Sequence, residues 1–377
     1  MRVVAAAAAL VAAGTAQAAA QADGEDVTWR VDGAGWGHGV GMAQYGARGM
    51  ALHGAGYGAI LGHFYTATRL GRAEDRTVRV LVREAVSRVS FTGATRACGR
   101  RLREDRTYRA TRSGDAVVLR TASGHRLAAC GGRLRATGGA TVVLAVKGRY
   151  RGALEVRPSG EQRLNAIDAV RLERYLRGVV GAEMPASWPA AALRTQAVVA
   201  RSYALTTDVG GEGYELYDDQ RSQVYRGVAG EAAATDAAVA VTAGRVVTFG
   251  GLPVSTPFFS SSGGRTEDVE NVWGGAPAAW LRSVADPRDS ASPYHRWTVV
   301  LTQAEMQERL GDLVPGELVA IDVTARGASP RIVAADVVGT TGRTTVAGEQ
   351  LRRRLRLRST WASFDRRPPL PPPPAAP

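Results

Sequence analysis

Apolar residues at helical spacing lead up to a single glutamate, Glu183. Within residues 171–179 the apolar positions lie three or four residues apart, a pattern that predicts a helix with one buried face. Gly178 and Gly181 then loosen the backbone, and Pro185 disfavours a helical conformation for the residue before it. We therefore expect Glu183 to lie in a corner of the chain and not on a helix.

A second helix is expected directly after this corner. Ser187 is a favourable N-cap residue, Pro189 suits the first turn, and residues 191–204 form an alanine-rich run. The predicted corner therefore lies between two helices.

Alternation with a period of two residues dominates the chain from Thr77 to Tyr150. Short apolar runs such as VRVLV, AVVLR and TVVLAV are separated by glycine- and serine-containing turns, which is typical of strands and hairpins. We expect an α+β fold in which a β-rich lobe leads into the helices around Glu183.

The apolar neighbours of Glu183 change what its carboxyl group can do. Loss of hydration disfavours the charged form, so we expect its pKa to be raised. A carboxylic acid that holds a proton near neutral pH can serve as the general acid of glycan cleavage. An exposed glutamate without a chemical role is the alternative. The apolar residues expected around the acid are Val179, Val180, Met184 and Trp188.

The chain contains five long motifs: YLRGVVGAEMPASWPAAALRTQAVVARSYA, SQVYRGV, FFSSSGGRTEDVENVWGG, WLRSVADPRD and GWGHGVGMAQYGARGMA. Together they resemble the stage II sporulation protein D (SpoIID/LytB) family, which comprises peptidoglycan lytic transglycosylases and amidase-enhancer relatives. The resemblance covers most of the chain after residue 26. It implies that Glu183, in the EMP motif, is the catalytic acid.

The order of these motifs departs from the family pattern. In the family the GWGHGVGM motif closes the domain, after a segment like residues 346–365, whereas here it opens the chain. Joining Asp365 to Val27 would restore the usual order, so we interpret the chain as a circular permutant. This hypothesis predicts that residues 35–70 pack beside Glu183.

Six glycines between positions 35 and 49 indicate tight turns or close backbone approach. The GxGxxG and GK[ST] frames of nucleotide-binding loops are absent from this stretch. His38 and Gln44 are the polar groups expected to reach a substrate, with a purely structural role as the alternative for His38. Residues 45–70 are expected to be helical in parts. The predicted buried face consists of Ile60, Leu61, Phe64 and Tyr65.

Further substrate contacts are expected on three other segments. The stretch YDDQRSQVYRGV mixes amide, hydroxyl and aromatic groups, which suits sugar binding, although a solvated loop is the alternative. The FFSSSGG stretch would let a polymer approach the backbone, Trp273 would stack on a sugar or fill the core, and Arg201 would hold an N-acetyl or carboxylate group. The predicted substrate-binding residues are His38, Gln44, Arg201, Ser222, Gln223, Tyr225, Ser261, Ser262 and Gly264.

The resemblance implies non-hydrolytic cleavage of the MurNAc–GlcNAc bond with formation of a 1,6-anhydro ring, a reaction in which one acid can serve both proton transfers. Hydrolysis by a muramidase would need a second carboxylate. A third hypothesis is a non-catalytic wall-binding protein that stimulates an amidase. Candidates for the second carboxylate are Asp168, Asp218, Asp219, Glu267 and Asp268.

The two ends of the sequence differ from its body. Residues 1–22 are expected to be a secretory signal peptide, and no later run is long and apolar enough to span a membrane. Residues 366–377 form a proline-rich tail. Between them we expect one domain, residues 23–365, made of a permuted segment (27–70), a β-rich lobe (77–165) and a catalytic core (166–365).

Charge and cysteines complete this picture of an exported protein. The net charge is +13, and arginine supplies nearly all of the basic residues. We interpret the charge as affinity for an anionic cell wall and expect no nucleic-acid partner, with compositional bias of the host as the alternative. Cys98 and Cys130 are expected to form a disulfide. No metal or other cofactor is expected, since neither cysteine belongs to a zinc-ligand spacing.

Overall fold

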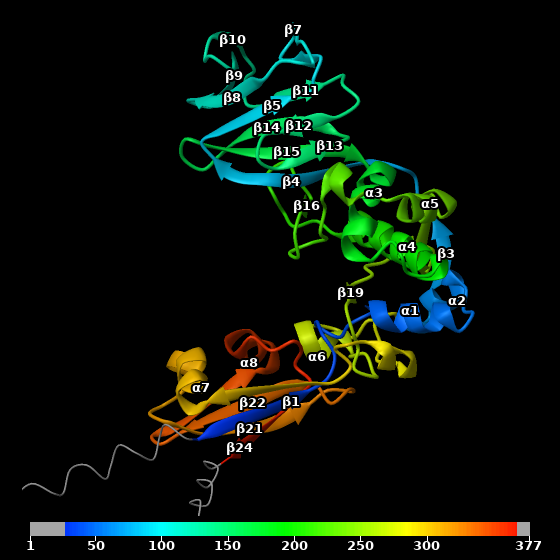
Figure 1. Cartoon of the computed structure of the whole chain (residues 1–377), viewed down its shortest axis with the longest axis vertical. Helices are drawn as coiled ribbons and strands as arrows, with labels where there is room; N and C mark the ends of the chain where they lie inside the picture. The colour runs from blue at the N-terminus through cyan, green and yellow to red at the C-terminus, as the bar shows by residue number, and fades with distance from the viewer. Residues whose placement is uncertain (1–26, 368–377) are drawn as a thin grey trace, which may run out of the picture. The chain divides into compact units, whose positions relative to one another are not determined.

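The computed structural model describes residues 27–367 and divides the chain into two compact units (Figure 1). Unit 1 combines Met1–Ala34 with Arg296–Pro377, and unit 2 is Gly35–His295. This division cuts both the expected segment 27–70 and the expected core 166–365. The expected signal peptide lies outside the described residues, as does the tail after Arg367.

Unit 1 is built from two three-stranded sheets and two helices around one core. The sheet orders are β20-β1-β24 and β21-β22-β23, and buried Trp29, Met306 and Leu355 contribute to the core. The strands are β1 (Thr28–Gly33), β20 (Trp297–Thr302), β21 (Leu318–Arg326), β22 (Ile332–Gly339), β23 (Gly342–Ala347) and β24 (Ala362–Arg367). The helices are α7 (Gln303–Leu310) and α8 (Gly348–Leu355), with a 3-10 turn η3 (Gly311–Leu313).

The first and last described strands of unit 1 are neighbours. Strand β1 pairs antiparallel with β24, and Thr28 lies opposite Arg367. Strand β24 therefore runs two residues past the expected domain end at Asp365. The two positions that a permutation would have separated therefore lie side by side, and the permutation itself stays a prediction.

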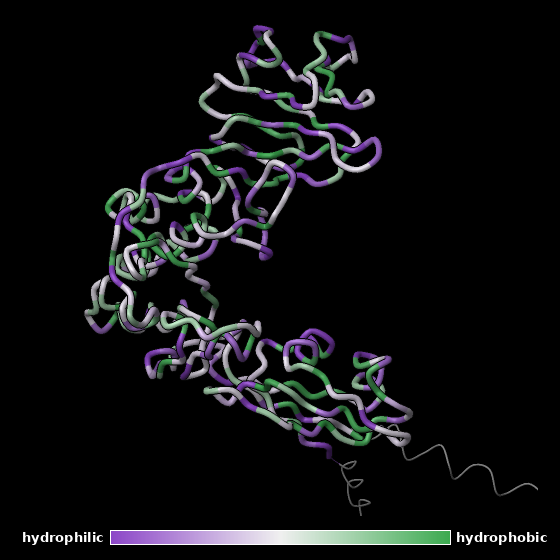
Figure 2. Tube along the Cα trace, turned by 180° about the vertical axis from the view of Figure 1, so that it is seen from behind, coloured by the Kyte–Doolittle hydropathy of each residue, from purple (hydrophilic) through white to green (hydrophobic). Residues whose placement is uncertain are grey.

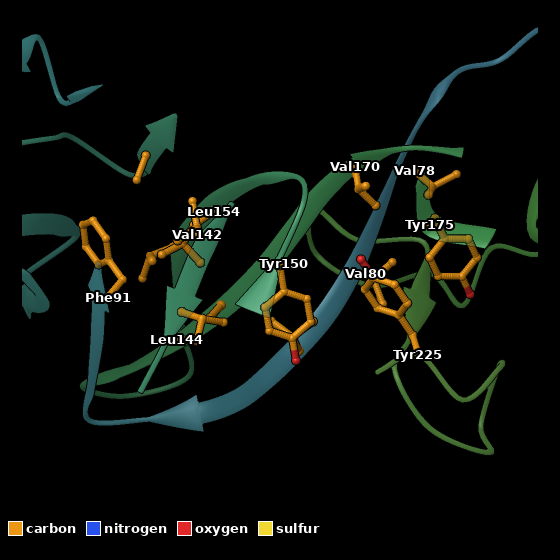
Figure 3. Packing of buried hydrophobic residues seen from close by; sticks show 14 of the residues in the cluster. Val78, Val80, Phe91, Val142, Leu144, Tyr150, Leu154, Val170, Tyr175 and Tyr225 are labelled. Carbon is orange, nitrogen blue, oxygen red and sulfur yellow. The ribbon is translucent and has the colours of Figure 1, made fainter. Parts of the chain in front are cut away.

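The β-rich lobe of unit 2 consists of two sheets that share one core (Figures 1 and 3). The seven-stranded sheet has the order β16-β4-β15-β14-β11-β6-β7, and the six-stranded sheet β10-β9-β8-β5-β12-β13. Hydrophobic and hydrophilic residues are interspersed along the lobe (Figure 2), and in β8 and β11 buried positions alternate with more exposed ones. The strands are β4 (Thr77–Val86), β5 (Arg88–Thr92), β6 (Arg96–Ala97), β7 (Arg100–Arg101), β8 (Tyr108–Ser113), β9 (Ala116–Thr121), β10 (Arg126–Ala129), β11 (Leu134–Thr137), β12 (Val142–Leu144), β13 (Gly148–Tyr150), β14 (Ala153–Ser159), β15 (Arg163–Arg171) and β16 (Leu216–Tyr217).

The remainder of unit 2 is mainly helical, and the expected α+β class is confirmed. Its small sheets are β18-β17-β3 and β19-β2. The helices are α1 (Gln44–Leu52), α2 (Tyr57–Phe64), α3 (Leu172–Glu183), α4 (Ala190–Thr206), α5 (Ala233–Val241) and α6 (Val269–Trp273), with 3-10 turns η1 (Gly227–Gly230) and η2 (Pro287–Ala291). The other strands are β2 (Met42–Ala43), β3 (Arg69–Arg72), β17 (Arg245–Phe249), β18 (Leu252–Pro253) and β19 (Phe258–Phe259).

Two local predictions for unit 2 are confirmed. The predicted apolar face of residues 60–65 is buried, and Cys98 and Cys130 form a disulfide. Because the two sulfurs are bonded to each other, neither is a thiolate that could bind a metal. Among the described residues, the helices are all too short or too polar to cross a bilayer.

Candidate functional site

Glu183 is the last residue of α3, so the prediction that it lies outside a helix is wrong by one residue. The helix continues through its two glycines because they allow close packing. A Cβ at Gly178 would lie 2.5 Å from the Tyr225 ring, and one at Gly181 would lie 2.2 Å from the Gly230 carbonyl oxygen. Met184 is extended, with φ −135° and ψ 132°, as expected for the residue before a proline.

The second helix begins at Ala190, with Pro189 at the N-cap position. The prediction of Ser187 as the N-cap is therefore wrong. The first helical carbonyl is that of Pro189, which accepts hydrogen bonds from the backbone N–H groups of Ala192 and Leu193 at 2.9 and 3.2 Å. A turn from Trp188 N–H to the Pro185 carbonyl occupies the residues between the helices. Glu183 therefore lies just before a short hydrogen-bonded turn.

The carboxyl group of Glu183 is partly buried and has one defined hydrogen-bond donor. Its Oε1 accepts a hydrogen bond of 2.6 Å from the backbone N–H of Val224. Burial raises the pKa of Glu183 to about 6, while the Val224 N–H and the positive charge of Arg226 act in the opposite direction. The raised pKa expected from the apolar neighbours is confirmed, and at pH 7 about one tenth of the group still holds its proton.

The loop that carries Val224 is fastened from both sides. The backbone N–H of Tyr217 donates to Ser222 Oγ at 3.1 Å, and the Tyr175 hydroxyl donates to Gln223 Oε1 at 3.2 Å. Gln223 is fully buried, and its Nε2 is a buried donor without a partner in the described part of the chain. Leaving such a buried donor without a partner costs about 1–3 kcal/mol. Ser222 and Gln223 thus shape the loop that holds the acid.

Gln44 connects the glycine-rich segment to the acid. Its Nε2 donates to the backbone carbonyl of Glu183 at 3.1 Å and lies 3.4 Å from Gln196 Oε1. This bond satisfies one of the carbonyls that the end of α3 leaves without a helical partner. The predicted packing of residues 35–70 beside Glu183 is thus observed, with Gln44 positioning the helix end.

The glycines before Gln44 adopt conformations that other residues avoid. Gly35, Gly37, Gly39 and Gly41 all have φ between 74° and 111°. His38 lies among them, where its Nδ1 accepts from the Val40 N–H at 3.1 Å and its Nε2 lies 3.0 Å from the Phe258 carbonyl oxygen. Both ring nitrogens are used inside the protein, which favours the structural alternative for His38.

Ser261 and Ser262 of the FFSSSGG stretch are fully buried, so the prediction that they contact substrate is wrong. Their hydroxyl groups donate to Asp289 Oδ2 at 2.8 Å and to Asp286 Oδ2 at 2.7 Å, respectively. Gly264 closes the turn by donating its N–H to Ser262 Oγ at 3.0 Å. These residues build a polar network that the sequence motif did not reveal.

This network lies directly under helix α1. A Cβ at Gly46 would lie 2.2 Å from Asp286 Oδ2, so only glycine allows this approach. Burial raises the pKa of Asp286 to about 7, whereas Asp289 accepts from the Gly263 N–H at 2.9 Å and lies 3.0 Å from His295 Nδ1. The network therefore fixes the glycine-rich segment in place.

Arg201 and Tyr225 are core residues, and their prediction as substrate contacts is wrong. Arg201 is 0% exposed and makes two hydrogen bonds of 2.8 Å with the carboxylate of Glu173. The Tyr225 ring packs against Tyr175 in the hydrophobic core (Figure 3), and its hydroxyl donates to Asp168 Oδ2 at 2.7 Å. Polar groups at these positions stabilise the interior.

A row of aromatic rings, which sequence reasoning missed as a unit, runs from the turn after Glu183 across unit 2. The ring centroids of Trp188 and Tyr45 lie 5.0 Å apart, those of Tyr45 and Tyr294 6.4 Å, and those of Tyr294 and Trp36 4.3 Å. All four side chains are at least partly accessible, and Trp36 is 39% exposed. We call these four residues the aromatic row.

The carboxylates considered for hydrolysis are engaged elsewhere. Asp168 is buried against Tyr225, and Asp218 pairs with Lys147 at 2.7 Å. Asp219 pairs with Arg221, Asp268 pairs with Arg282, and Glu267 accepts from the Asp268 backbone N–H. Burial is the main cause of the raised pKa of Glu183, and the groups that act against it are the Val224 N–H and Arg226. The site therefore presents one acid with a raised pKa, followed along the chain by the partly exposed ring of Trp188, and a carboxyl group with such a pKa can act as a general acid.

Comparison with known proteins shows which family the segment around Glu183 is similar to. Residues 160–249, which contain Glu183, match the SpoIID family model, "Stage II sporulation protein". The chain is 33% identical to stage II sporulation protein D of Bacillus subtilis (strain 168) over 211 residues. The matched stretch is 52% of this chain and 60% of that protein. The chain thus contains a SpoIID-like segment, and this segment includes Glu183.

Two further relatives extend the comparison. Stage II sporulation protein D of Bacillus amyloliquefaciens is 30% identical over 212 residues, which is 52% of this chain and 60% of that protein. The amidase enhancer of Bacillus subtilis (strain 168) is 34% identical over 138 residues, which is 37% of this chain and 18% of that protein. The chain matches only 60% of the length of the sporulation proteins, and less of the enhancer.

Proposed function

We propose that this protein is a peptidoglycan lytic transglycosylase that cleaves the MurNAc–GlcNAc bond. The observation that carries the proposal is the raised pKa of Glu183, about 6, in a site where the neighbouring charge is a cation and not a second carboxylate. One acid that can both release and take back a proton near neutral pH matches a reaction that consumes no water.

Glu183 would perform two proton transfers in this reaction. It first protonates the glycosidic oxygen, so that the bond to C1 of the muramyl residue breaks and the leaving sugar departs as an alcohol. The carboxylate then takes the proton of the muramyl C6 hydroxyl, and O6 bonds to C1 to close the 1,6-anhydro ring. The Val224 N–H and Arg226 stabilise the intervening carboxylate, which keeps the proton from being held too tightly.

The aromatic row supports a glycan as the ligand. Aromatic faces pack against the C–H faces of sugar rings, and the row begins at Trp188, five residues after the acid. A polymer bound along Trp36, Tyr294 and Tyr45 would present one of its bonds to Glu183. Export, association with the cell wall and a circularly permuted chain order are parts of the same proposal. The adjacent ends of β1 and β24 support the last of these.

A second candidate function is stimulation of a cell-wall amidase without catalysis by this chain. The observation in its favour is the 34% identity to the amidase enhancer of Bacillus subtilis. In that case the aromatic row would bind glycan, and Glu183 would be dispensable for activity.

Mass spectrometry of purified glycan strands, with and without stem peptides, tests the proposal. The wild type and Glu161→Gln, a variant at an exposed glutamate of the same unit, should release fragments with 1,6-anhydro ends. Glu183→Gln should release none. Reducing ends in place of anhydro ends would show hydrolysis, and an absence of cleavage by the wild type together with stimulation of an amidase would favour the second candidate.

A further inference from the structure

The positive charge of the protein is concentrated in one part of the β-rich lobe. Residues 96–135 contain eleven arginines and three acidic residues, a net charge of +8 out of +13 for the whole chain. Strongly hydrophilic residues follow the hairpins at this end of unit 2 (Figure 2). The charge is therefore a local property of this lobe and not only an average of the composition.

Four of these arginines line one surface pocket of about 470 Å³. Arg96 and Arg101 belong to the β6–β7 hairpin and lie directly opposite each other in its register. Like charges in such a cross-strand pair repel each other. The pocket is completed by Arg100, Arg135, Ala97, Cys98, Gly99 and Thr137. We call this pocket, which the four arginines line together with the other residues, the arginine pocket.

Most of the positive charge of these four arginines is not compensated by acidic side chains. Within residues 27–367, Arg96, Arg100 and Arg101 form no ion pair, and all three are exposed. Arg135 pairs with Glu155 at 2.5 Å but shares that one carboxylate with three further arginines. These are Arg79, Arg133 and Arg157, at 3.7, 3.7 and 3.2 Å. A bound anion would relieve this repulsion.

The hairpin that presents the arginines is rigidly held. Its two turn residues, Cys98 and Gly99, have φ values of 49° and 73°, a feature of the tight turns that match the twist of paired strands. Cys98 is also joined to Cys130 by the disulfide. The guanidinium groups are therefore arranged on a constrained backbone before any ligand arrives, which lowers the entropic cost of binding.

We propose that the arginine pocket binds a linear phosphodiester polymer with sugar or polyol units. Guanidinium groups offer a planar pair of N–H donors that fits phosphate oxygens. The pocket lining contains no aromatic or amide side chain that could stack on or read a base, which disfavours a nucleic acid. This binding is independent of Glu183 and of glycan cleavage. It would attach the protein to an anionic polymer through the positively charged β-rich lobe.

Fluorescence anisotropy with labelled poly(glycerol phosphate) tests the proposal on the whole chain. Wild type should bind with an affinity that falls steeply as salt rises. Arg96→Gln/Arg101→Gln should bind at least about tenfold more weakly at low salt, with a salt slope reduced by about two, since each lost phosphate contact removes about one released counterion.

Matched variants separate a pocket from diffuse charge. Arg69→Gln/Arg72→Gln removes two exposed arginines of the same unit from β3 and should weaken binding by less than about threefold. Arg96→Lys/Arg101→Lys keeps the charge but not the planar donors, so its affinity should lie between those of the wild type and the glutamine pair. If the glutamine pair does not fold, Arg100→Gln should still weaken binding about threefold.

Four results would overturn the proposal. They are an absence of polymer binding by the wild type, equal losses in the β6–β7 and β3 variants, equally tight binding of single-stranded DNA of the same charge, and displacement of the polymer by inorganic phosphate at equal phosphate concentration. Thermal unfolding of each folded variant at the wild-type temperature is the control for structure.

Discussion

Glu183 and Asp168 are two carboxyl groups on consecutive elements, α3 and β15, and burial raises the pKa of both. The pKa values are about 6 for Glu183 and about 7 for Asp168. Asp168, however, is 2% exposed and accepts the Tyr225 hydroxyl inside the core, whereas Glu183 ends a helix and is only partly buried. A raised pKa supplies a proton, but exposure at a helix end decides whether that proton can reach a ligand.

The largest expected effect is on catalysis, and it separates the two acids. Glu183→Gln should lower the rate of anhydro-product release by about 10³-fold or more, because a carboxamide has no proton to donate. Asp168→Asn should stay within about threefold of the wild type, because its amide oxygen still accepts from Tyr225. Initial rates on glycan strands measure both. Equal losses in the two variants would contradict the assignment of the site to Glu183.

The second prediction concerns Arg201, which resembles Asp168 in being a polar residue of the interior. Arg201→Met should lower the free energy of unfolding by about 3 kcal/mol, because it leaves the carboxylate of Glu173 without its bidentate partner. Urea unfolding measures the change. Arg194→Met, on the same helix and without such a pair, is the control and should change stability by less than about 0.5 kcal/mol. A stable Arg201→Met variant that binds glycan weakly would restore Arg201 as a ligand contact.

The third prediction uses the pH dependence of stability. The folded protein holds a proton on Glu183 more tightly than the unfolded chain does, so this contribution is fully present below pH about 4.5 and is lost as pH rises through about 6. Glu183→Gln keeps an acceptor for the Val224 N–H but cannot ionise. It should therefore be more stable than the wild type above pH about 7, by up to about 2 kcal/mol, with little difference below pH about 4.5.

Urea unfolding from pH 4 to 8 measures this difference. Because the sign follows from the raised pKa, a variant that is less stable than the wild type at high pH and equally stable at low pH would show that the folded protein instead favours the ionised carboxylate. Glu161→Gln serves as the surface control.

The smallest expected effect tests the aromatic row. Trp36→Ala should raise KM about tenfold while changing kcat by less than about threefold, since the ring contacts sugar units away from the reacting bond. Leu252→Ala, which removes an exposed apolar side chain elsewhere in unit 2, should leave both constants unchanged. A loss confined to kcat would place Trp36 in the reaction itself.

Much of the backbone around Glu183 was predictable from the sequence. The spacing of apolar residues predicted α3, and the alanine-rich run predicted α4. Pro185 predicted the extended conformation of Met184. The N-cap of α4 was wrongly assigned to Ser187 because a proline can also precede the first helical turn. The end of α3 was placed too early because glycines such as Gly178 and Gly181 also permit close packing inside a helix.

Side-chain roles were harder to predict, because polarity in a sequence does not reveal burial. Ser261 and Ser262 looked like ligand contacts but bind Asp289 and Asp286, whose side chains come from a later turn. The aromatic row draws its rings from three separate segments, so no local pattern contains it. Tertiary packing supplies the information that spacing cannot.

The most direct test of the account is the pKa of the Glu183 carboxyl group in the folded protein. Carbon-13 NMR of glutamate-labelled protein follows each carboxyl resonance with pH, and loss of one resonance in Glu183→Gln assigns it. The account predicts a midpoint of about 6. A midpoint at or below about 4.5, the value of an ordinary glutamate, would contradict it.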